Sequence, residues 1–176
     1  SKKLIEKMGG TITFESTEGR GTIFVIRVPF RIDTDRESKA ETEAKTDASI
    51  RGLHILLAED NELNMEIAEF MLQNEGAVVT KTWNGQEAVE IFEKSRPDEF
   101  DVILMDIMMP VKNGYEAAKM IRSMDREDAK TIPIIAMTAN AFTEDRIKAK
   151  EAGMDEHISK PIDMKLLVKI IHELVY

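Results

Sequence analysis

The chain has 176 residues, no cysteine, 43% hydrophobic residues and a formal net charge of −9. This composition fits a globular protein, and the missing cysteines exclude a disulfide framework and a thiolate metal site. No apolar run approaches the roughly 20 residues that span a bilayer, and no signal peptide opens the chain. The first residues have helical character, so we expect a piece of a longer protein.

The charge is distributed unevenly. Residues 1–52 carry ten Lys or Arg and nine Asp or Glu, whereas residues 53–176 carry fourteen and twenty-four. An acidic part without a basic cluster is a poor nucleic-acid binder, because phosphate recognition needs a positive footprint. We expect most of these acidic side chains to form a solvated surface, and we expect no nucleic-acid partner and no membrane contact by this chain.

The first 30 residues have the pattern of a helix end followed by a β-hairpin. Residues 1–8 place apolar side chains at helical spacing before two glycines. Residues 11–16 and 22–30 alternate β-branched or aromatic side chains with polar ones, and Glu18-Gly-Arg-Gly21 separates them as a turn. A helix stub and hairpin of this size are too small to build a hydrophobic core.

Residues 31–52 are predicted to be a linker. They include no aromatic residue, and Ile32 and Ile50 are their only large apolar side chains. The remaining residues are small, polar or of mixed charge and define no apolar face. We expect this segment to be flexible or transiently helical.

From residue 53 onward a strand–helix alternation repeats five times, which predicts an α/β fold. The run Val102–Met105 is apolar without alternation, as in a strand covered on both faces. Five strands that are each followed by a helix predict a doubly wound five-stranded parallel sheet of flavodoxin-like order. The strands are expected at 53–59, 77–82, 101–106, 132–138 and 154–159.

The helices have recognisable starts and stops. Asn84 and Asn113 each precede a Glu by three residues, a capping-box pattern. A hairpin turn at each Asn-Gly pair is less favoured, because helical periodicity follows both pairs. Gly76 and Gly153 are expected to end the first and fourth helices. The first helix, 62–74, has one face with Leu63, Ile67, Phe70 and Met71; the fourth opens at Thr143; the last opens at Asp163, with a stripe of Leu166, Leu167, Ile170, Ile171 and Leu174.

Reactive side chains occupy the ends of four predicted strands. Glu59 and Asp60 follow the first strand, Asp106 ends the third, Thr138 ends the fourth, and Lys160 follows the fifth. Carboxyl ends of parallel strands share one edge, where ligands bind in open α/β sheets. We therefore expect three carboxylates, one hydroxyl and one ammonium group to converge there.

Such a cluster predicts a metal-assisted phosphoryl acceptor. Two carboxylates about 4 Å apart repel by roughly 4 kcal/mol, and a hard cation such as Mg²⁺ would offset this. Asp106 could then stay ionised and attack phosphorus as a nucleophile. Lys160 and the metal can each bind a phosphoryl oxygen, and Thr138 can donate to another. Pro161 would help fix the lysine, through a cis bond.

Each of these signals, taken alone, has an ordinary structural explanation. An Asp at a strand end usually caps the next helix, and a Glu-Asp pair is usually exposed. A Thr there is often only a good β-former, and Lys-Pro is common in loops. The four signals at the ends of the correct strands are far more specific together.

Residues 53–176 resemble a receiver domain of two-component signalling. The matching motifs are Glu59-Asp-Asn61, Met105-Asp-Ile-Met-Met-Pro110 with Gly114, Ala136-Met-Thr-Ala139 and Lys160-Pro161. The resemblance implies that Asp106 is phosphorylated from a histidine. It also implies these roles: Mg²⁺ ligation by Glu59, Asp60, Asp106 and the Met108 carbonyl, a switch hydroxyl on Thr138, phosphate binding by Lys160, and structural roles for Pro110, Gly114 and Pro161.

Three positions depart from the family pattern or refine it. Glu59 replaces the commoner Asp and should keep the metal. His157 stands where the family often has a Tyr or Phe whose ring moves with the switch hydroxyl, so His157 is either a switch residue or a surface histidine. Met108 is bulky and apolar, and we expect it to shield the acyl phosphate from water.

Residues 1–30 resemble the C-terminal end of a histidine-kinase ATP-binding domain. Lys3-Leu-Ile-Glu-Lys-Met-Gly-Gly10, Phe14-Glu-Ser16, Gly19-Arg-Gly-Thr-Ile-Phe24 and Pro29-Phe30 carry this resemblance. The upstream ATP-binding segments and a phosphodonor helix are absent, so the chain has no complete kinase active site. The order kinase tail, linker, receiver implies a hybrid histidine kinase, a phosphohistidine donor, a histidine phosphotransfer protein as the next carrier, and a cytoplasmic location with a possible membrane anchor elsewhere in the parent.

Two other functions compete with the receiver. A Mg²⁺-dependent phosphatase with an aspartyl-phosphate intermediate usually places a second Asp two residues after the nucleophile, where this chain has Met108. A flavodoxin-like cofactor module needs a phosphate-cradling loop after the first strand, where this chain has Glu59-Asp-Asn-Glu62.

Overall fold

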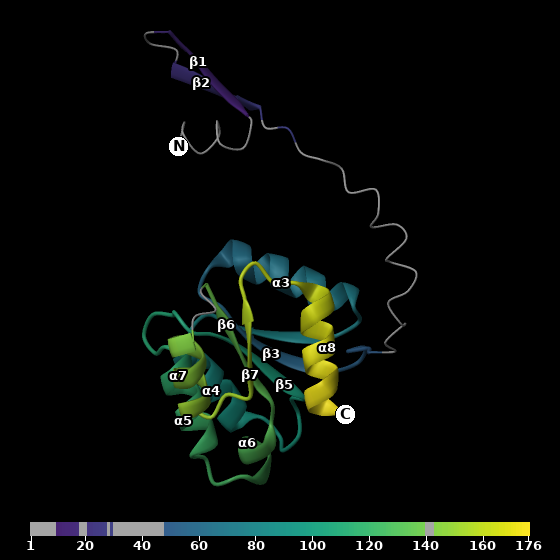
Figure 1. Ribbon diagram of the computed structural model, residues 1–176. Coiled ribbons are helices and arrows are strands. Elements are labelled where there is room, and N and C mark those ends of the chain that lie inside the picture. The colour runs from purple at the N-terminus through teal and green to yellow at the C-terminus, as the bar shows by residue number, and fades with distance from the viewer. Residues whose placement is uncertain (1–9, 18–20, 28, 30–47, 140–142) are drawn as a thin grey trace. The chain divides into compact units, whose positions relative to one another are not determined.

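The structure is a computed structural model that describes residues 10–17, 21–27, 29, 48–139 and 143–176. The chain divides into two compact units, before and after residue 45, which are described separately (Figure 1). The predicted helix end within residues 1–8 and most of the predicted linker lie outside the described residues. The boundaries at 30 and 52 stay a prediction.

The smaller unit contains an antiparallel hairpin, as its alternation predicts. Strand β1 (Thr11–Thr17) pairs with β2 (Gly21–Arg27), in a register that sets Thr11 opposite Arg27. The second strand was expected to continue to residue 30. Pro29 has no regular structure, and its missing N–H cannot contribute a ladder hydrogen bond.

The larger unit has five parallel strands in the order β4-β3-β5-β6-β7, which confirms the doubly wound sheet (Figure 1). Because β3 and β5 are neighbours at the centre, their carboxyl ends lie side by side. The strands are β3 (His54–Ala58), β4 (Val78–Thr82), β5 (Val102–Asp106), β6 (Ile134–Thr138) and β7 (Glu156–Ser159). The helices are α3 (Glu62–Asn74), α4 (Gly85–Lys94), α5 (Gly114–Arg122), α6 (Glu127–Thr131), α7 (Thr143–Glu151) and α8 (Met164–Val175).

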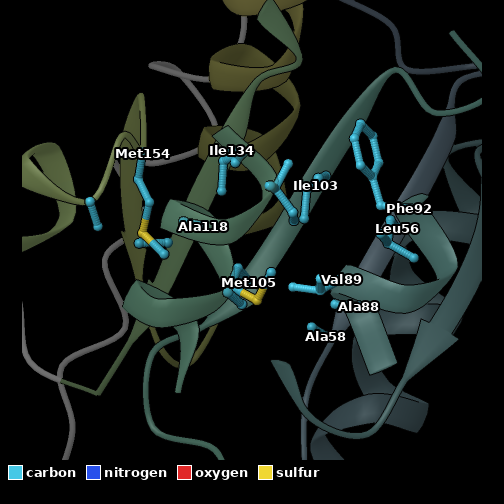
Figure 2. Close-up of a cluster of buried hydrophobic side chains, with 14 of the residues drawn as sticks. Leu56, Ala58, Ala88, Val89, Phe92, Ile103, Met105, Ala118, Ile134 and Met154 are labelled. Atoms are coloured by element: carbon cyan, nitrogen blue, oxygen red, sulfur yellow. The ribbon is translucent and has the colours of Figure 1, made fainter. Parts of the chain in front are cut away.

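Both faces of the sheet are buried, because alternate residues of the central strands enter two different cores. On β5, Ile103 and Met105 face the core under α4, α5 and α7, whereas Val102 and Leu104 face the core under α3 and α8. Figure 2 shows the first of these cores, where Val89 and Phe92 of α4 meet strand side chains. This double coverage explains the unbroken apolar runs in the sequence.

The predicted helix starts and stops are confirmed, but the full capping box predicted at Asn84 is not formed, because the Glu87 carboxylate accepts from the Trp83 N–H. Asn84 and Asn113 cap α4 and α5 through their side chains, and Asn113 forms a full capping box with Glu116. Asp163 caps α8. Gly76 and Gly153 have φ of 85°, a left-handed conformation that glycine adopts without strain at a helix end.

Four features differ from the sequence prediction or add to it. The face of α3 with Leu63, Ile67 and Phe70 is exposed, and the helix instead packs on the sheet through its buried residues Met65, Ala68 and Leu72. On α8, Leu167 and Ile171 are buried whereas Leu166 is exposed. The short helix α6 between α5 and β6 was not expected. Ile50, assigned to the linker, is fully buried in the core under α3 and α8.

Candidate functional site

Three carboxylates meet at the carboxyl edge of the sheet. Ala58 of β3 pairs with Met105 of β5, so the residues that follow them, Glu59 and Asp106, are neighbours. One carboxylate oxygen from each of Glu59, Asp60 and Asp106 lies within 4.8 Å of the others. Glu59 and Asp106 are buried, and Asp60 is exposed. The sequence prediction that these side chains converge is therefore correct in its geometry.

Lys160 reaches this carboxylate cluster from the end of β7, which lies on the far side of β6 from Asp106. It directly follows β7, and its Nζ donates hydrogen bonds to Oδ2 of Asp106 at 2.6 Å and to Oε2 of Glu59. Only 20% of the lysine side chain is exposed. The Lys160–Pro161 peptide bond is cis, as the sequence suggested.

Burial and charge shift the ionisation of this group of side chains. Burial raises the pKa of Asp106, and the nearby Glu59 adds to this, while the hydrogen bond from Lys160 opposes it. Burial alone would lower the pKa of Lys160, but hydrogen bonds to Asp106 and Glu59 raise it above its ordinary value. The ammonium group is thus held charged between two carboxylates.

Glu59 is held in one orientation by the start of α3. Its Oε1 accepts hydrogen bonds from the backbone N–H of Asn61 at 3.3 Å and from Nδ2 of Asn64 at 3.1 Å. Its Oε2 faces Lys160. Asn64 was missed in the sequence, where the only signal is a second Asn three residues after Asn61.

The loop after Asp106 folds back over the end of β5. The Met108 N–H donates to Oδ1 of Asp106 at 3.2 Å, and the Met108 side chain is 76% exposed. The Gly114 N–H donates to the carbonyl of Ile107 at 3.0 Å. A Cβ at Gly114 would overlap the Asp106 carbonyl oxygen, so no other residue fits there without a backbone shift. The loop also holds Pro110, whose carbonyl accepts the Lys112 N–H at 2.7 Å.

Thr138 and His157 lie on the two strands beyond Asp106. Thr138 is buried at the end of β6, and its carbonyl accepts the Lys160 N–H at 2.7 Å. Its strand neighbour Met137 pairs with Asp106. His157 is half-buried on β7, two residues before Ser159, which pairs with Thr138.

The side chains present fit a hard divalent cation. All three converging donors are carboxylate oxygens, the ligand type that Mg²⁺ prefers, and two of them are buried. Burial raises the pKa of Asp106 even though Lys160 donates to this carboxylate. A cation at this edge would favour its charged form.

Residues 55–172 match the family model of the response regulator receiver domain, so the chain belongs to this family. This match and the sheet topology confirm both the resemblance and the fold predicted from the sequence. No helix within the described segments is long and apolar enough to cross a membrane.

Relatives and solved structures support the same assignment. The aerobic respiration control sensor protein ArcB of Escherichia coli is 32% identical over 172 residues, which cover 97% of this chain and 21% of ArcB. The receiver domain of the sensor histidine kinase PA1611 from Pseudomonas aeruginosa, with a magnesium ion in its active-site cleft, is 40% identical with a TM-score of 0.64, over 70% of this chain and 98% of that one.

A third match is a complex. The receiver domain of the response regulator Ssk1 from Saccharomyces cerevisiae was crystallised with the histidine phosphotransfer protein Ypd1; it is 31% identical with a TM-score of 0.64, over 71% of this chain and 90% of that one. The matched segment is 21% of the length of ArcB and 7% of the length of hybrid signal transduction histidine kinase I of Dictyostelium discoideum, so the chain spans only a small part of these relatives.

Proposed function

We propose that Asp106 is the phosphoryl acceptor of a phosphorelay. The observation that carries this proposal is the position of Asp106 at the sheet edge, with carboxylate oxygens of Glu59 and Asp60 within 4.8 Å and Nζ of Lys160 at 2.6 Å. This arrangement offers a nucleophile, a candidate cation site and a fixed positive charge at one point.

In the proposed reaction an oxygen of Asp106 attacks the phosphorus of a phosphohistidine. A P–O bond forms as the P–N bond breaks, and the imidazole leaves with the electron pair of that bond. Glu59, Asp60, Asp106 and the Met108 carbonyl would hold Mg²⁺, which when bound neutralises the carboxylates and the phosphoryl oxygens. Lys160 would bind a phosphoryl oxygen through its Nζ.

Thr138 would respond to the phosphoryl group on Asp106. Its buried position at the end of β6, next to the strand of Asp106, supports a role in which its hydroxyl donates to the phosphoryl group. Movement of the residues after β6 would then bias α7 and β7, with His157 as part of the change.

A phosphatase is not favoured. Its second carboxylate, two residues after the nucleophile, would have to stand where this chain has the side chain of Met108. The thioether of Met108 can neither protonate a leaving group nor activate water, as a carboxylate at this position would. The acyl phosphate should therefore accumulate.

We infer that the partner which exchanges phosphoryl groups with Asp106 is a histidine phosphotransfer protein. Helix α3 starts two residues after Asp60 and exposes Leu63, Ile67 and Phe70, which are three or four residues apart and so share one face. An exposed apolar stripe beside a reactive site suits a protein partner. The Ssk1 complex with Ypd1 supports this kind of partner for a related domain.

The parent protein is proposed to be a hybrid histidine kinase located in the cytoplasm or anchored to the membrane by another segment. The alignment with ArcB covers nearly the whole chain, including the hairpin and the residues of the predicted linker. This supports residues 1–30 as the end of a kinase ATP-binding domain, 31–52 as a linker and 53–176 as the receiver.

Intact-mass measurement tests the proposal. After incubation with acetyl phosphate and Mg²⁺, the wild-type chain should gain the mass of one phosphoryl group, which is lost in base. Asp106→Asn should gain none, and chelation of Mg²⁺ should prevent the gain. Repeated release of inorganic phosphate with no retained group would instead favour the phosphatase.

A further inference from the structure

We propose that Asn64 is a positioning residue for the cation site, one that the longer side chain of Glu59 makes necessary. This inference rests on the proposed Mg²⁺ site. It assigns the orienting of a carboxylate to Asn64, a residue in the first turn of α3 that lies outside the Glu59-Asp60 motif.

The two oxygens of Glu59 have separate partners. Oε1 accepts from the Asn61 N–H at 3.3 Å and from Asn64 Nδ2 at 3.1 Å, both at the start of α3. Oε2 points into the cluster, where Lys160 donates to it. Only 2% of Glu59 is exposed, so these protein contacts hold its carboxylate away from bulk solvent.

The need for this contact follows from side-chain length. A Glu has one more rotatable bond than an Asp, so its carboxylate can occupy more positions and loses more rotamer entropy when it is fixed. A donor on Oε1 removes that freedom before a cation binds, and it leaves Oε2 directed at the cluster, where Lys160 donates to it. Hydrogen bonds of this kind orient metal ligands, and their removal commonly lowers the metal affinity by tenfold or more.

The side chain of Asn64 is not required to start the helix. Asn61 is the N-cap of α3, and its Oδ1 accepts the backbone N–H of Asn64 at 3.0 Å. That bond uses the backbone N–H of residue 64, so it would persist in Asn64→Ala. The amide group of Asn64 therefore acts on Glu59 and not on the helix end.

The test is Mg²⁺ titration by isothermal calorimetry of the 176-residue chain. Asn64→Ala should weaken Mg²⁺ binding by about tenfold. Asn74→Ala, an exposed asparagine at the other end of the same helix, should leave the affinity within about twofold of wild type. Thermal unfolding in EDTA should show that both variants remain folded.

Repeating the Asn64→Ala substitution in the Glu59→Asp variant tests whether Asn64 acts by positioning the Glu59 carboxylate or by a general structural role. In Glu59→Asp we expect the carboxylate, shorter by one methylene, to lose the 3.1 Å contact with Nδ2 of Asn64, so adding Asn64→Ala should change the affinity by less than about twofold. The inference is overturned if wild type binds Mg²⁺ but Asn64→Ala binds it equally well, or if the loss is the same in both backgrounds. If wild type binds no Mg²⁺, the proposed cation site itself fails, and the inference fails with it.

Discussion

Nζ of Lys160 lies 2.6 Å from Oδ2 of Asp106, although strand β6 separates their strands in the sheet. The lysine therefore reaches across one strand to place its charge against the buried carboxylates of Asp106 and Glu59. Among the described residues, Lys160 is the cation that forms ion pairs with both of these carboxylates.

Removing this charge should destabilise the chain most when no metal is present. Lys160→Ala in EDTA should lose about 3 kcal/mol of unfolding free energy, the cost of breaking a buried ion pair. Saturating Mg²⁺ should narrow the difference from wild type, because the variant lacks the ammonium group that repels the cation and so gains more stability when Mg²⁺ binds its folded state. Urea unfolding measures both values, with the exposed Lys165→Ala as control. A loss that is equal with and without Mg²⁺ would contradict the cation role.

Acid stability should depend on the ion pair between Arg126 and Asp128, 2.6 Å apart and largely buried. The hydrogen bond from Arg126 lowers the pKa of Asp128 from 3.8 to about 2. A depressed pKa gives stability above pH 3.8, about 2 kcal/mol, that disappears as the pH falls toward 2. Asp128→Asn should therefore be less stable than wild type at pH 7 by about this amount.

The pH profile of urea unfolding checks the assignment. The gap between wild type and Asp128→Asn should narrow as the pH falls from 4 to 2. The exposed Asp125→Asn should show no such gap. A difference that stays constant over this range would mean that the variant acts through packing and not through ionisation.

The exposed side chain of Met108 should lengthen the life of the acyl phosphate. Met108→Asn replaces an apolar group by one that can hydrogen-bond water near Asp106. One such bond, worth about 1 kcal/mol, should speed hydrolysis about fivefold. Loss of the phosphoryl mass over time measures this, with Met120→Asn on α5 as control. An unchanged lifetime would remove the shielding role.

The exposed apolar face of α3 should affect phosphoryl transfer from a partner protein but not phosphorylation by a small molecule. Phe70, 66% exposed, adds little to the core, so Phe70→Ala should leave phosphorylation by acetyl phosphate unchanged. Transfer from phosphorylated Ypd1, used as a test donor, should weaken roughly tenfold, as for a central aromatic contact. Val78→Ser, exposed at the amino end of β4, is the control. Equal transfer by Phe70→Ala and wild type would place the docking surface elsewhere.

Much of the fold could be predicted from local patterns. Apolar runs such as Val102–Met105 identify strands buried on both faces, and Asn113 with Glu116 identifies a helix start, because both signals depend only on neighbouring residues. The site residues could also be placed at one edge, since parallel strands end there.

The face by which α3 packs could not be read from the sequence. The helix has two sets of apolar residues at helical spacing, one with Leu63 and Phe70 and the other with Met65 and Leu72. Periodicity shows that each set forms a face, but only contact with the sheet decides which of them is buried. Ile50 is a similar case, because an isolated apolar residue in a polar segment has no pattern to mark it.

The sequence by itself determined the fivefold strand–helix alternation, the family, and the residues that stand at the strand ends. Only the tertiary structure decided that Lys160 crosses β6 to reach Asp106, that Asn64 turns one oxygen of Glu59 away from the cluster, and that Arg126 pairs with a buried Asp128. The physical reason is one of range. Strand and helix signals arise between residues a few positions apart, whereas side-chain orientation and ionisation depend on groups that only the folded chain brings together.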